Sequence, residues 1–357
     1  MEKVTQETIA EQLHLSRNTV SKVFNGIPGV KEKTRERILE QARLLGYTHP
    51  LLGNAGGPPD ENTPVSKSTE SRPTAELRYD IAFVCYQKSI SDFFWMSIIL
   101  NLERTLSQHG CTMRFVVIGL EHEQTMSPPG ALLNNPPDGI VMAGLFQSEY
   151  YKSISSLGIP LVTFDISSDL FHCNRMCDVI MVENLGASYQ LTRHLIEAGH
   201  TRIAFAGNKD SCQSFFERWQ GYHLAMQESP LTRAGEITLH FNLEGADFRG
   251  KEYYTTDEFY EQLKSMPKLP TAFVCGNDYI ASNVIKLKEP PYRLYDQVAV
   301  TGFDNTSELI ASIPSCSTVD IHSTEIGQMM GEQILWRLQN PKSSWRCLRL
   351  DSAVIIK

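Results

Sequence analysis

Three polar side chains near the N-terminus, Arg17, Asn18 and Lys22, have the chemistry to read the edges of DNA base pairs. Arginine and lysine donate hydrogen bonds to guanine O6 and N7, and asparagine makes a paired contact with adenine N6 and N7. Their spacing puts them on the outer face of one short helix. The apolar residues of that helix fall on the inner face: Val20, Val23 and Phe24.

Other polar residues of this region are better suited to phosphate oxygens, which set the register of a protein on DNA but carry no sequence information. They are Thr5, Ser16, Thr19, Ser21, Asn25 and Lys31. Residues 1–49 carry a net charge of +2, whereas the whole chain carries −8. A small basic region on an acidic chain favours local phosphate binding and argues against coating of nucleic acid by the whole protein.

The elements that must position these side chains are three short helices within residues 1–47. Thr5 and Ser16 lie where a side-chain oxygen caps the first turn of a helix, and Gly46 follows the third helix as a C-terminal stop. Residues 14–16 form the tight turn that a helix-turn-helix requires. Any three-helix module with a charged outer face shares this periodicity, so periodicity alone does not decide for DNA.

The order of residues in this region resembles the DNA-binding head of the lactose-repressor (LacI/GalR) family. The match is collinear and without gaps over more than 40 residues: Val4-Thr5, Ile9-Ala10, Leu15-Ser16, Thr19 to Val23, Asn25-Gly26, Val30, Thr34-Arg35, Ile38 and Leu45-Gly46-Tyr47. The resemblance implies an all-α helix-turn-helix head over residues 1–47, with Arg17, Asn18 and Lys22 as the base-reading residues. It also implies a transcriptional repressor, with an activator as the alternative.

Residues 48–78 differ from that family pattern. The family follows its head with a short hinge helix, but this stretch is rich in proline and glycine, with Gly56 at the position where the family inserts a leucine into the minor groove. Proline and glycine at this density oppose a helix. We therefore predict a flexible linker over residues 48–78 in place of the hinge helix.

Residues 79–357 alternate short apolar runs with helical patterns. We expect strands at 81–86, 114–118, 139–143, 160–164, 202–206, 272–275 and 298–301, and helices at 92–108 and 186–198. Such alternation is typical of parallel sheets covered by helices on both faces. The length favours two α/β lobes over one core. We place the N-lobe at 79–181 and 322–340, and the C-lobe at 182–321 and 341–357.

Polar residues directly follow three of the apolar runs, at Asp165, Asn277 and Asp304. Ligands of open α/β sheets bind at the carboxyl ends of the strands. Arg218 supplies a fork of donors and Asp304 two acceptors, a combination suited to vicinal hydroxyl groups. Alternative roles remain open, since Arg218 and Asp304 could form a structural ion pair and Asp165 could serve a turn.

The body also resembles the effector domain of the same family, a two-lobed fold similar to periplasmic sugar-binding proteins. The resemblance is carried by residues 194–204 (HLIEAGHTRIA) and 218–222 (RWQGY). It implies an effector site at Ser91, Asp92, Phe93, Phe94, Asp165, Ser214, Arg218, Asn277 and Asp304. The implied partners are a sugar or sugar derivative between the lobes, a second copy of the chain, and a pseudo-palindromic double-stranded operator. A non-sugar effector such as a nucleobase is the alternative.

Several function classes lack support in the sequence. Motifs of nucleophilic hydrolases, phosphate-binding loops, dinucleotide folds and zinc peptidases are absent, so we expect no enzyme and no cofactor. The eight cysteines include no CxxC pair and are expected to be free thiols without a metal. Neither a run of 18 apolar residues nor an apolar signal core is present, which predicts a cytoplasmic protein without membrane contact.

Overall fold

The computed structural model describes residues 5–13, 15–24, 30–45, 79–86, 93–144, 146–172, 176–230, 237–239, 256–307, 311 and 313–357. The chain divides into two units, residues 1–73 and residues 74–357. The whole of the predicted linker, residues 48–78, lies outside the described residues, as do Asn25, Gly46, Ser91 and Asp92.

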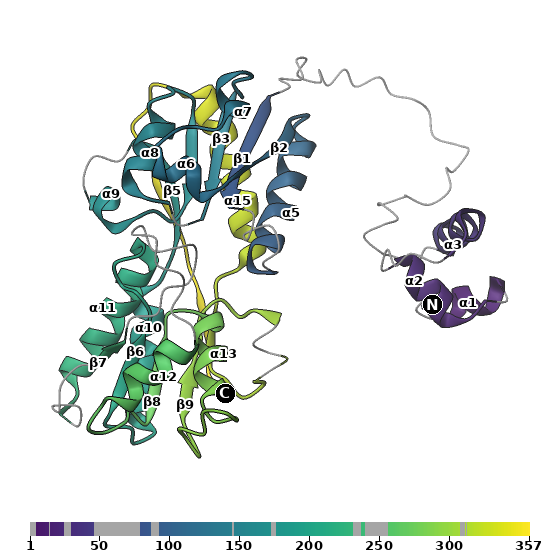
Figure 1. Ribbon diagram of the computed structural model, residues 1–357. Helices are drawn as coiled ribbons and strands as arrows, with labels where there is room; N and C mark the ends of the chain where they lie inside the picture. The colour runs from purple at the N-terminus through teal and green to yellow at the C-terminus, as the bar shows by residue number, and fades with distance from the viewer. Residues whose placement is uncertain are drawn as a thin grey trace, which may run out of the picture. The chain divides into compact units, whose positions relative to one another are not determined.

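The first unit contains three helices, α1 (Gln6–Leu13), α2 (Arg17–Phe24) and α3 (Glu32–Leu44) (Figure 1). Their inner faces meet in one small core, as the periodicity predicts: Ile9, Ala10, Val20, Val23, Ile38 and Ala42. Both predicted caps form, because the Thr5 and Ser16 hydroxyls accept hydrogen bonds from the backbone N–H groups of Thr8 and Thr19, at 3.3 and 3.2 Å.

The N-lobe of the second unit is built on a parallel six-stranded sheet in the order β11-β5-β4-β3-β1-β2. Its strands are β1 (Asp80–Tyr86), β2 (Thr112–Ile118), β3 (Gly139–Ala143), β4 (Leu161–Phe164), β5 (Asp178–Val182) and β11 (Cys347–Leu350). The four inner strands are almost entirely buried, because helices cover both faces of a parallel sheet.

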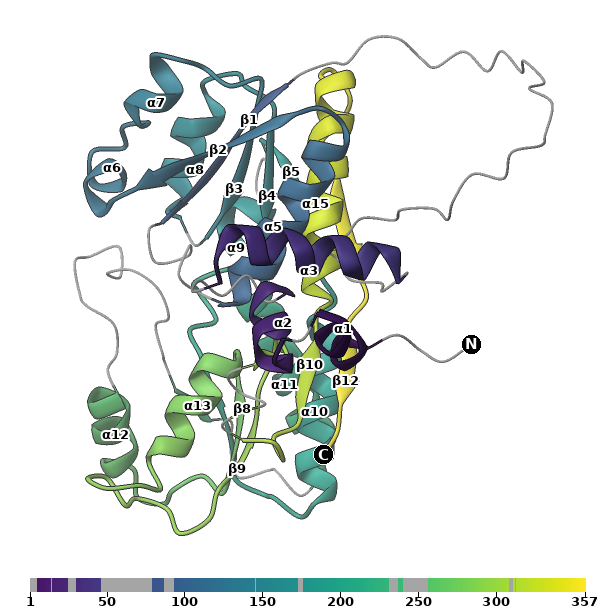
Figure 2. The ribbon, with the colours of Figure 1, turned by 90° about the vertical axis from the view of Figure 1, so that its right-hand side faces the viewer.

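Helices α5 (Phe93–Gln108) and α15 (Ser323–Gln339) lie side by side on one face of this sheet (Figures 1 and 2). The opposite face is covered by shorter helices: α6 (Leu120–Gln124), α7 (Gly130–Leu133), α8 (Ser148–Ser155) and α9 (Ser168–His172). Helix α15 comes from the far end of the chain, so the two ends of the body fold into one lobe.

The C-lobe has a parallel four-stranded sheet in the order β7-β6-β8-β9. Its strands are β6 (Ile203–Ala206), β7 (Ile237–Leu239), β8 (Ala272–Cys275) and β9 (Ala299–Thr301). Its helices are α10 (Leu185–Glu197), α11 (Gln213–Glu228), α12 (Thr256–Lys264) and α13 (Asp278–Lys286). Helices α10 and α11 pack so closely that a Cβ atom at Gly221 would lie 2.1 Å from the Leu185 carbonyl oxygen, which explains the glycine of the RWQGY segment.

The expected assignment of residues 341–357 to the C-lobe is wrong in part. β11 (Cys347–Leu350) pairs with β5 as the edge of the N-lobe sheet. β12 (Ala353–Ile355) is not part of that sheet. It pairs antiparallel with β10 (Thr318–Asp320) in a separate two-stranded sheet. The alternating half-exposed residues of β11 suit an edge strand, but they do not indicate which sheet the strand joins.

Among the described residues, no helix has both the length and the apolar content that crossing a membrane requires.

Candidate functional site

Helix α2 presents the predicted DNA-reading side chains. Arg17 begins the helix and is exposed, and Lys22 is half-buried in its last turn. Helix α2 therefore has an exposed cation at its start and a partly buried cation in its last turn. The side chains of Asn18 and Asn25 lie outside the described residues, so the geometry covers two of the three predicted base readers.

The described residues predicted to contact phosphate lie on α2 or directly before a helix of the head. The Ser16 and Thr19 hydroxyl oxygens lie 2.8 Å apart, and Ser21 is half-buried in the middle of the helix. Thr5 and Lys31 are exposed, and each directly precedes a helix, α1 or α3. Hydroxyls and backbone N–H groups at helix N-termini are suited to phosphate, since the helix dipole favours negative charge there.

In the second unit, Arg218 of α11 is the centre of the predicted effector residues. Its guanidinium donates from Nε to Asn184 Oδ1 at 2.9 Å and from Nη1 to the Gly276 carbonyl oxygen at 2.6 Å. Nη2 lies 3.4 Å from Asp304 Oδ1, and the group stacks on the Phe303 ring at 3.7 Å from its centroid. Among the described residues, two of the five guanidinium N–H groups donate hydrogen bonds and the contact with Asp304 is an ion pair, so donors are left for a ligand.

Asp165 joins the two lobes at this place. It follows β4 of the N-lobe, and its Oδ1 accepts a hydrogen bond from the backbone N–H of Ser214, in the first turn of α11 in the C-lobe. A second bond joins the lobes directly, from Gln213 N–H to the Ile166 carbonyl oxygen at 2.8 Å. The predicted residues Asp165, Ser214 and Arg218 are therefore brought together at one junction.

The environment of Asp165 is unusual for a carboxylate. Burial raises its pKa, although hydrogen bonds from Cys212, Ile166 and Ser214 and the nearby Arg218 charge partly oppose that shift. Its backbone has a φ of 60°, in the left-handed region. Asp304 has a φ of 109°, which non-glycine residues rarely adopt. Such conformations cost about 1–3 kcal/mol each and gather at functional sites.

Asn277, a predicted effector residue, and its neighbour Asp278 have different roles at the start of α13. Asn277 is the N-cap of α13, and its Oδ1 accepts from Ile280 N–H at 3.0 Å. Asp278 is buried and accepts from Thr306 N–H at 2.6 Å and from the Thr318 hydroxyl at 2.8 Å. Asp278 therefore has a structural role. The half-buried Asn277 follows Gly276, whose carbonyl oxygen contacts Arg218.

The aromatic part of the predicted site is described in part. Phe94 is half-buried and packs edge-on against Trp95, with ring centroids 4.9 Å apart, and near Phe164, the residue before Asp165. The backbone of Phe93 begins α5, but its side chain lies outside the described residues, as do Ser91 and Asp92.

Two residues at this junction, Asn184 and Glu217, were missed by sequence reasoning. Asn184 follows β5, a strand that the expected pattern omitted, and its polar side chain comes just after an apolar run, the signal that singled out Asp165. Glu217 directly precedes Arg218. Its importance depends on Arg349, which is 132 residues away in sequence, and no local pattern indicates that contact.

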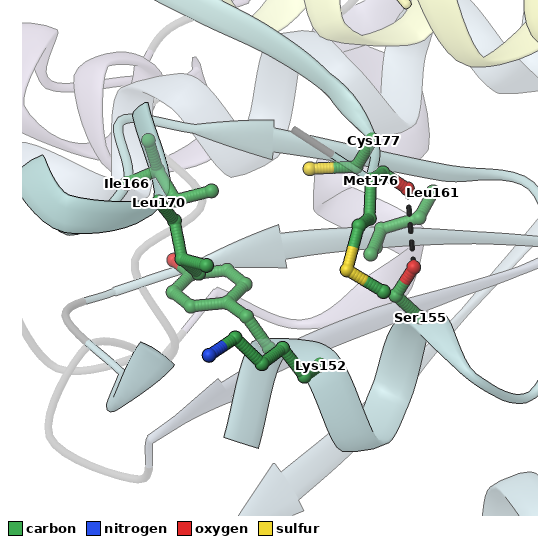
Figure 3. A pocket seen from close by; sticks show the side chains of 8 residues that line it. Lys152, Ser155, Leu161, Ile166, Leu170, Met176 and Cys177 are labelled. Carbon is green, nitrogen blue, oxygen red and sulfur yellow. Dashed lines mark hydrogen bonds between the residues drawn. The ribbon is translucent and has the colours of Figure 1, made fainter. Parts of the chain in front are cut away.

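A separate pocket in the N-lobe contains none of the predicted effector residues (Figure 3). Its walls come from α8, β4 and the segments around α9: Tyr151, Lys152, Ser155, Leu161, Ile166, Leu170, Met176 and Cys177. They are mainly apolar, and the Ser155 hydroxyl is already bonded to the Met176 carbonyl oxygen at 3.1 Å. Nowhere in the described ranges do three or more His, Cys, Asp or Glu side chains gather as metal ligands would.

Comparison with known proteins identifies relatives over nearly the whole chain. A family profile described as a periplasmic binding protein-like domain matches residues 192–355. The ribose operon repressor of Haemophilus influenzae is 22% identical, over 99% of this chain and 97% of its own length.

Solved structures share the fold. A transcriptional regulator CelR–cellobiose complex has a TM-score of 0.61 at 21% identity and covers 99% of this chain and 98% of its own. The lac repressor dimer bound to operator and the anti-inducer ONPF has a TM-score of 0.59 at 19% identity, over 99% and 98% of the two chains. The predicted combination of a helical head with a two-lobed α/β body is confirmed by this similarity.

Proposed function

This chain belongs to the LacI/GalR family of transcriptional regulators, and from that premise we propose that it is a cytoplasmic repressor whose operator affinity changes when a sugar or sugar derivative binds between its lobes. Members of this family are regulators and not enzymes, in agreement with the motifs that the sequence lacks. The observation that carries the effector proposal is the incompletely bonded Arg218 beside Asp304 at the lobe junction.

The chemistry of the junction supports a polyhydroxylated effector. Asp304 offers acceptors and Arg218 donors, an arrangement that suits adjacent hydroxyl groups. Ser214 and Asn277 add short polar groups nearby, and Phe94 offers an aromatic ring to an apolar sugar face. A thermal-shift screen of sugars, nucleobases and amino acids on the whole chain tests the proposal, because a ligand that binds only the folded state raises the unfolding temperature.

The screen separates the two effector classes directly. Stabilisation by a sugar, together with a changed affinity for a selected operator, supports the proposal. Stabilisation by nucleobases alone replaces it with the alternative effector. Operator affinity that no bound compound changes contradicts effector control altogether.

For the head, we propose that Arg17, Asn18 and Lys22 read bases, whereas Thr5, Ser16, Thr19, Ser21, Asn25 and Lys31 contact phosphates. Support comes from the exposure of Arg17 at the start of α2 and from the core that holds α2 against α1 and α3. Arg17→Ala should weaken binding to the selected operator by about 1–3 kcal/mol and relax the preference for one base pair. Fluorescence anisotropy on operator variants measures both effects.

The matched control is Lys31→Ala, which removes a cation assigned to phosphate. It should weaken binding by similar amounts on all sequences and reduce the salt dependence. A uniform loss for Arg17→Ala would instead make Arg17 a phosphate contact.

We further propose a homodimer that places two heads on a pseudo-palindromic operator. The support is an apolar surface on α5 and the edge strand β2, formed by four exposed side chains: Met96, Leu100, Phe115 and Val117. Exposed apolar groups of this size on neighbouring elements are typical of interfaces. Leu100→Glu should shift the mass measured by analytical ultracentrifugation towards the monomer, while Leu224→Glu, on α11, should leave it unchanged.

A further inference from the structure

Asn184 stands at the start of α10, a position where an asparagine side chain usually caps the helix. Asn184 is the N-cap residue of α10, yet its side chain makes no capping hydrogen bond. The carboxylate of Glu183 accepts those bonds instead, from Gly186 N–H at 2.8 Å and Ala187 N–H at 2.9 Å. Because Glu183 satisfies the first turn of the helix, the amide of Asn184 is available for other contacts.

Asn184 uses its amide to hold Arg218. Its Oδ1 accepts from Arg218 Nε at 2.9 Å, while its Nδ2 lies within bonding distance of the Val182 carbonyl oxygen, Ser214 Oγ and Glu217 Oε2, at 2.9, 3.3 and 3.1 Å. The amide is therefore fixed in orientation, with its oxygen towards the guanidinium. A donor turned towards Arg218 would repel it, so the orientation of Asn184 matters for the effector site.

Glu217 is held in turn by Arg349 of β11. The two nitrogens Nη1 and Nη2 of Arg349 lie 2.7 Å from Glu217 Oε2 and Oε1, a paired contact between the N-lobe sheet and α11 of the C-lobe. Gln213 Nε2 adds a bond to Glu217 at 3.1 Å. Burial alone would raise the pKa of Glu217, but the hydrogen bonds from Arg349, Gln213 and Asn184 outweigh it and lower the pKa.

We propose that Asn184, oriented by the Arg349–Glu217 ion pair, is a positioning residue that fixes the Arg218 guanidinium for effector binding. The chain of contacts is continuous, from Arg349 on one lobe through Glu217 and Asn184 to Arg218. Arg349 reaches solvent, with 37% of its side chain exposed, whereas Glu217 and Arg218 are buried. A partly exposed side chain in the N-lobe thus sets the geometry of a buried donor in the C-lobe. The effector role of Arg218 rests on the proposed function; its positioning does not.

Arginine Nε–H spectra of the full chain, labelled with ¹⁵N at arginine Nε, test the positioning directly, with Arg218→Lys identifying the Arg218 signal. Asn184→Ala and Arg349→Met should each move that signal and speed exchange of its Nε hydrogen with water by about 2- to 10-fold, the factor that corresponds to one net hydrogen bond. Arg349→Lys should lie between Arg349→Met and the parent, because it keeps the charge but not the paired geometry.

Arg114→Met is the matched control, since Arg114 is a partly exposed arginine like Arg349 and forms an ion pair with Asp80 at the opposite edge of the same sheet. It should leave the Arg218 signal unchanged. If Arg349→Met fails to fold because it leaves Glu217 buried and unpaired, the double variant Glu217→Gln/Arg349→Met removes both charges and takes its place. An Arg218 signal that is the same in these variants as in Arg114→Met overturns the proposal.

Titration with cellobiose, the ligand of one similar structure, and with each compound that stabilises the chain separates this proposal from the proposed function. If Arg349→Met changes the Arg218 signal but no compound does, the positioning role holds and effector binding at Arg218 fails. If a compound shifts the Arg218 signal and binds the parent and Arg349→Met equally, the positioning proposal fails alone.

Discussion

Two buried arginine–carboxylate pairs in the body differ in how completely they are bonded. Arg337 and Asp178 are 1% and 0% exposed and lie within the N-lobe, whereas Arg218 and Asp304 are 6% and 8% exposed at the lobe junction. The closest contact is 2.6 Å in the first pair and 3.4 Å in the second. Burial is similar, so it does not explain the difference.

Every N–H group of Arg337 has a partner. Nε and Nη2 donate to the two oxygens of Asp178 at 2.8 and 2.6 Å, and three further bonds reach the carbonyl oxygens of Asn340, Ser343 and Ser344. Asp178 also accepts from Gln333 Nε2 and from the backbone N–H of Arg346. Such a group fastens the loop between α15 and β11 and has no donor left for a ligand.

Among the described residues, Arg218 donates hydrogen bonds from two of its five N–H groups, and the backbone of its ion-pair partner Asp304 has a φ of 109°. A buried ion pair is therefore a candidate binding site when its arginine has donors left and the backbone is strained, and a structural element when neither condition is met.

Replacing each of the two arginines with lysine should give the largest effect, a difference in how much the free energy of unfolding falls. Arg337→Lys should lower the free energy of unfolding by about 3 kcal/mol, because lysine cannot replace the paired contact and the three carbonyl bonds. Arg218→Lys should cost about 1 kcal/mol, since fewer bonds are lost. Urea unfolding of both variants measures the difference. Equal losses would make Arg218 a structural arginine and remove the contrast.

The affinity for the effector should be reduced more by Arg218→Lys than by Arg337→Lys, the reverse of the order for stability. Arg218→Lys should weaken binding of the compound found by the screen by roughly 10- to 100-fold, the effect of losing one or two charged hydrogen bonds. Arg337→Lys, assayed at a temperature where it remains folded, should bind within about twofold of the parent. Isothermal titration calorimetry on both variants decides the point, and a comparable loss at Arg337 would contradict the assignment.

Asp278 is a third buried carboxylate, and among the described residues it accepts hydrogen bonds from hydroxyl and backbone N–H groups and not from an arginine. Burial raises its pKa to about 6, although hydrogen bonds from Thr306 and Thr318 oppose the shift. An acid with a raised folded-state pKa loses stability as the pH rises from its unfolded value, near 4, through 6. The parent should therefore lose about 1 kcal/mol relative to Asp278→Asn between pH 5 and pH 7. An unfolding difference that stays constant over this interval would refute the raised pKa.

Much of the fold could be predicted from local patterns. The expected strands at 139–143 and 272–275 coincide with β3 and β8, because buried parallel strands are continuous apolar runs bounded by polar residues. β5 was missed although Asp178–Val182 has the same character, and with it the position of Asn184 was lost. β11 was assigned to the wrong lobe, since an edge strand with alternating exposure fits either sheet.

Part of the candidate site could also be predicted from local patterns, and part could not. Asp165, Asn277 and Asp304 could be recognised because each follows a strand, and the carboxyl ends of parallel strands meet at one edge of a sheet. The capping of α13 by Asn277 in place of Asp278 could not be foreseen, because both residues are suited to that position.

Local patterns in the amino-acid sequence are sufficient to predict the three-helix head, the strand and helix alternation of the body, and the polar residues of the lobe junction. Those features depend on local periodicity and on neighbours in the chain. The folded chain is needed to see that Arg337 is fully bonded whereas Arg218 is not, and that Arg349 contacts Glu217, 132 residues away in sequence. These contacts cannot be predicted locally because the partners of each donor are distant in the chain and come within hydrogen-bond distance when the chain folds.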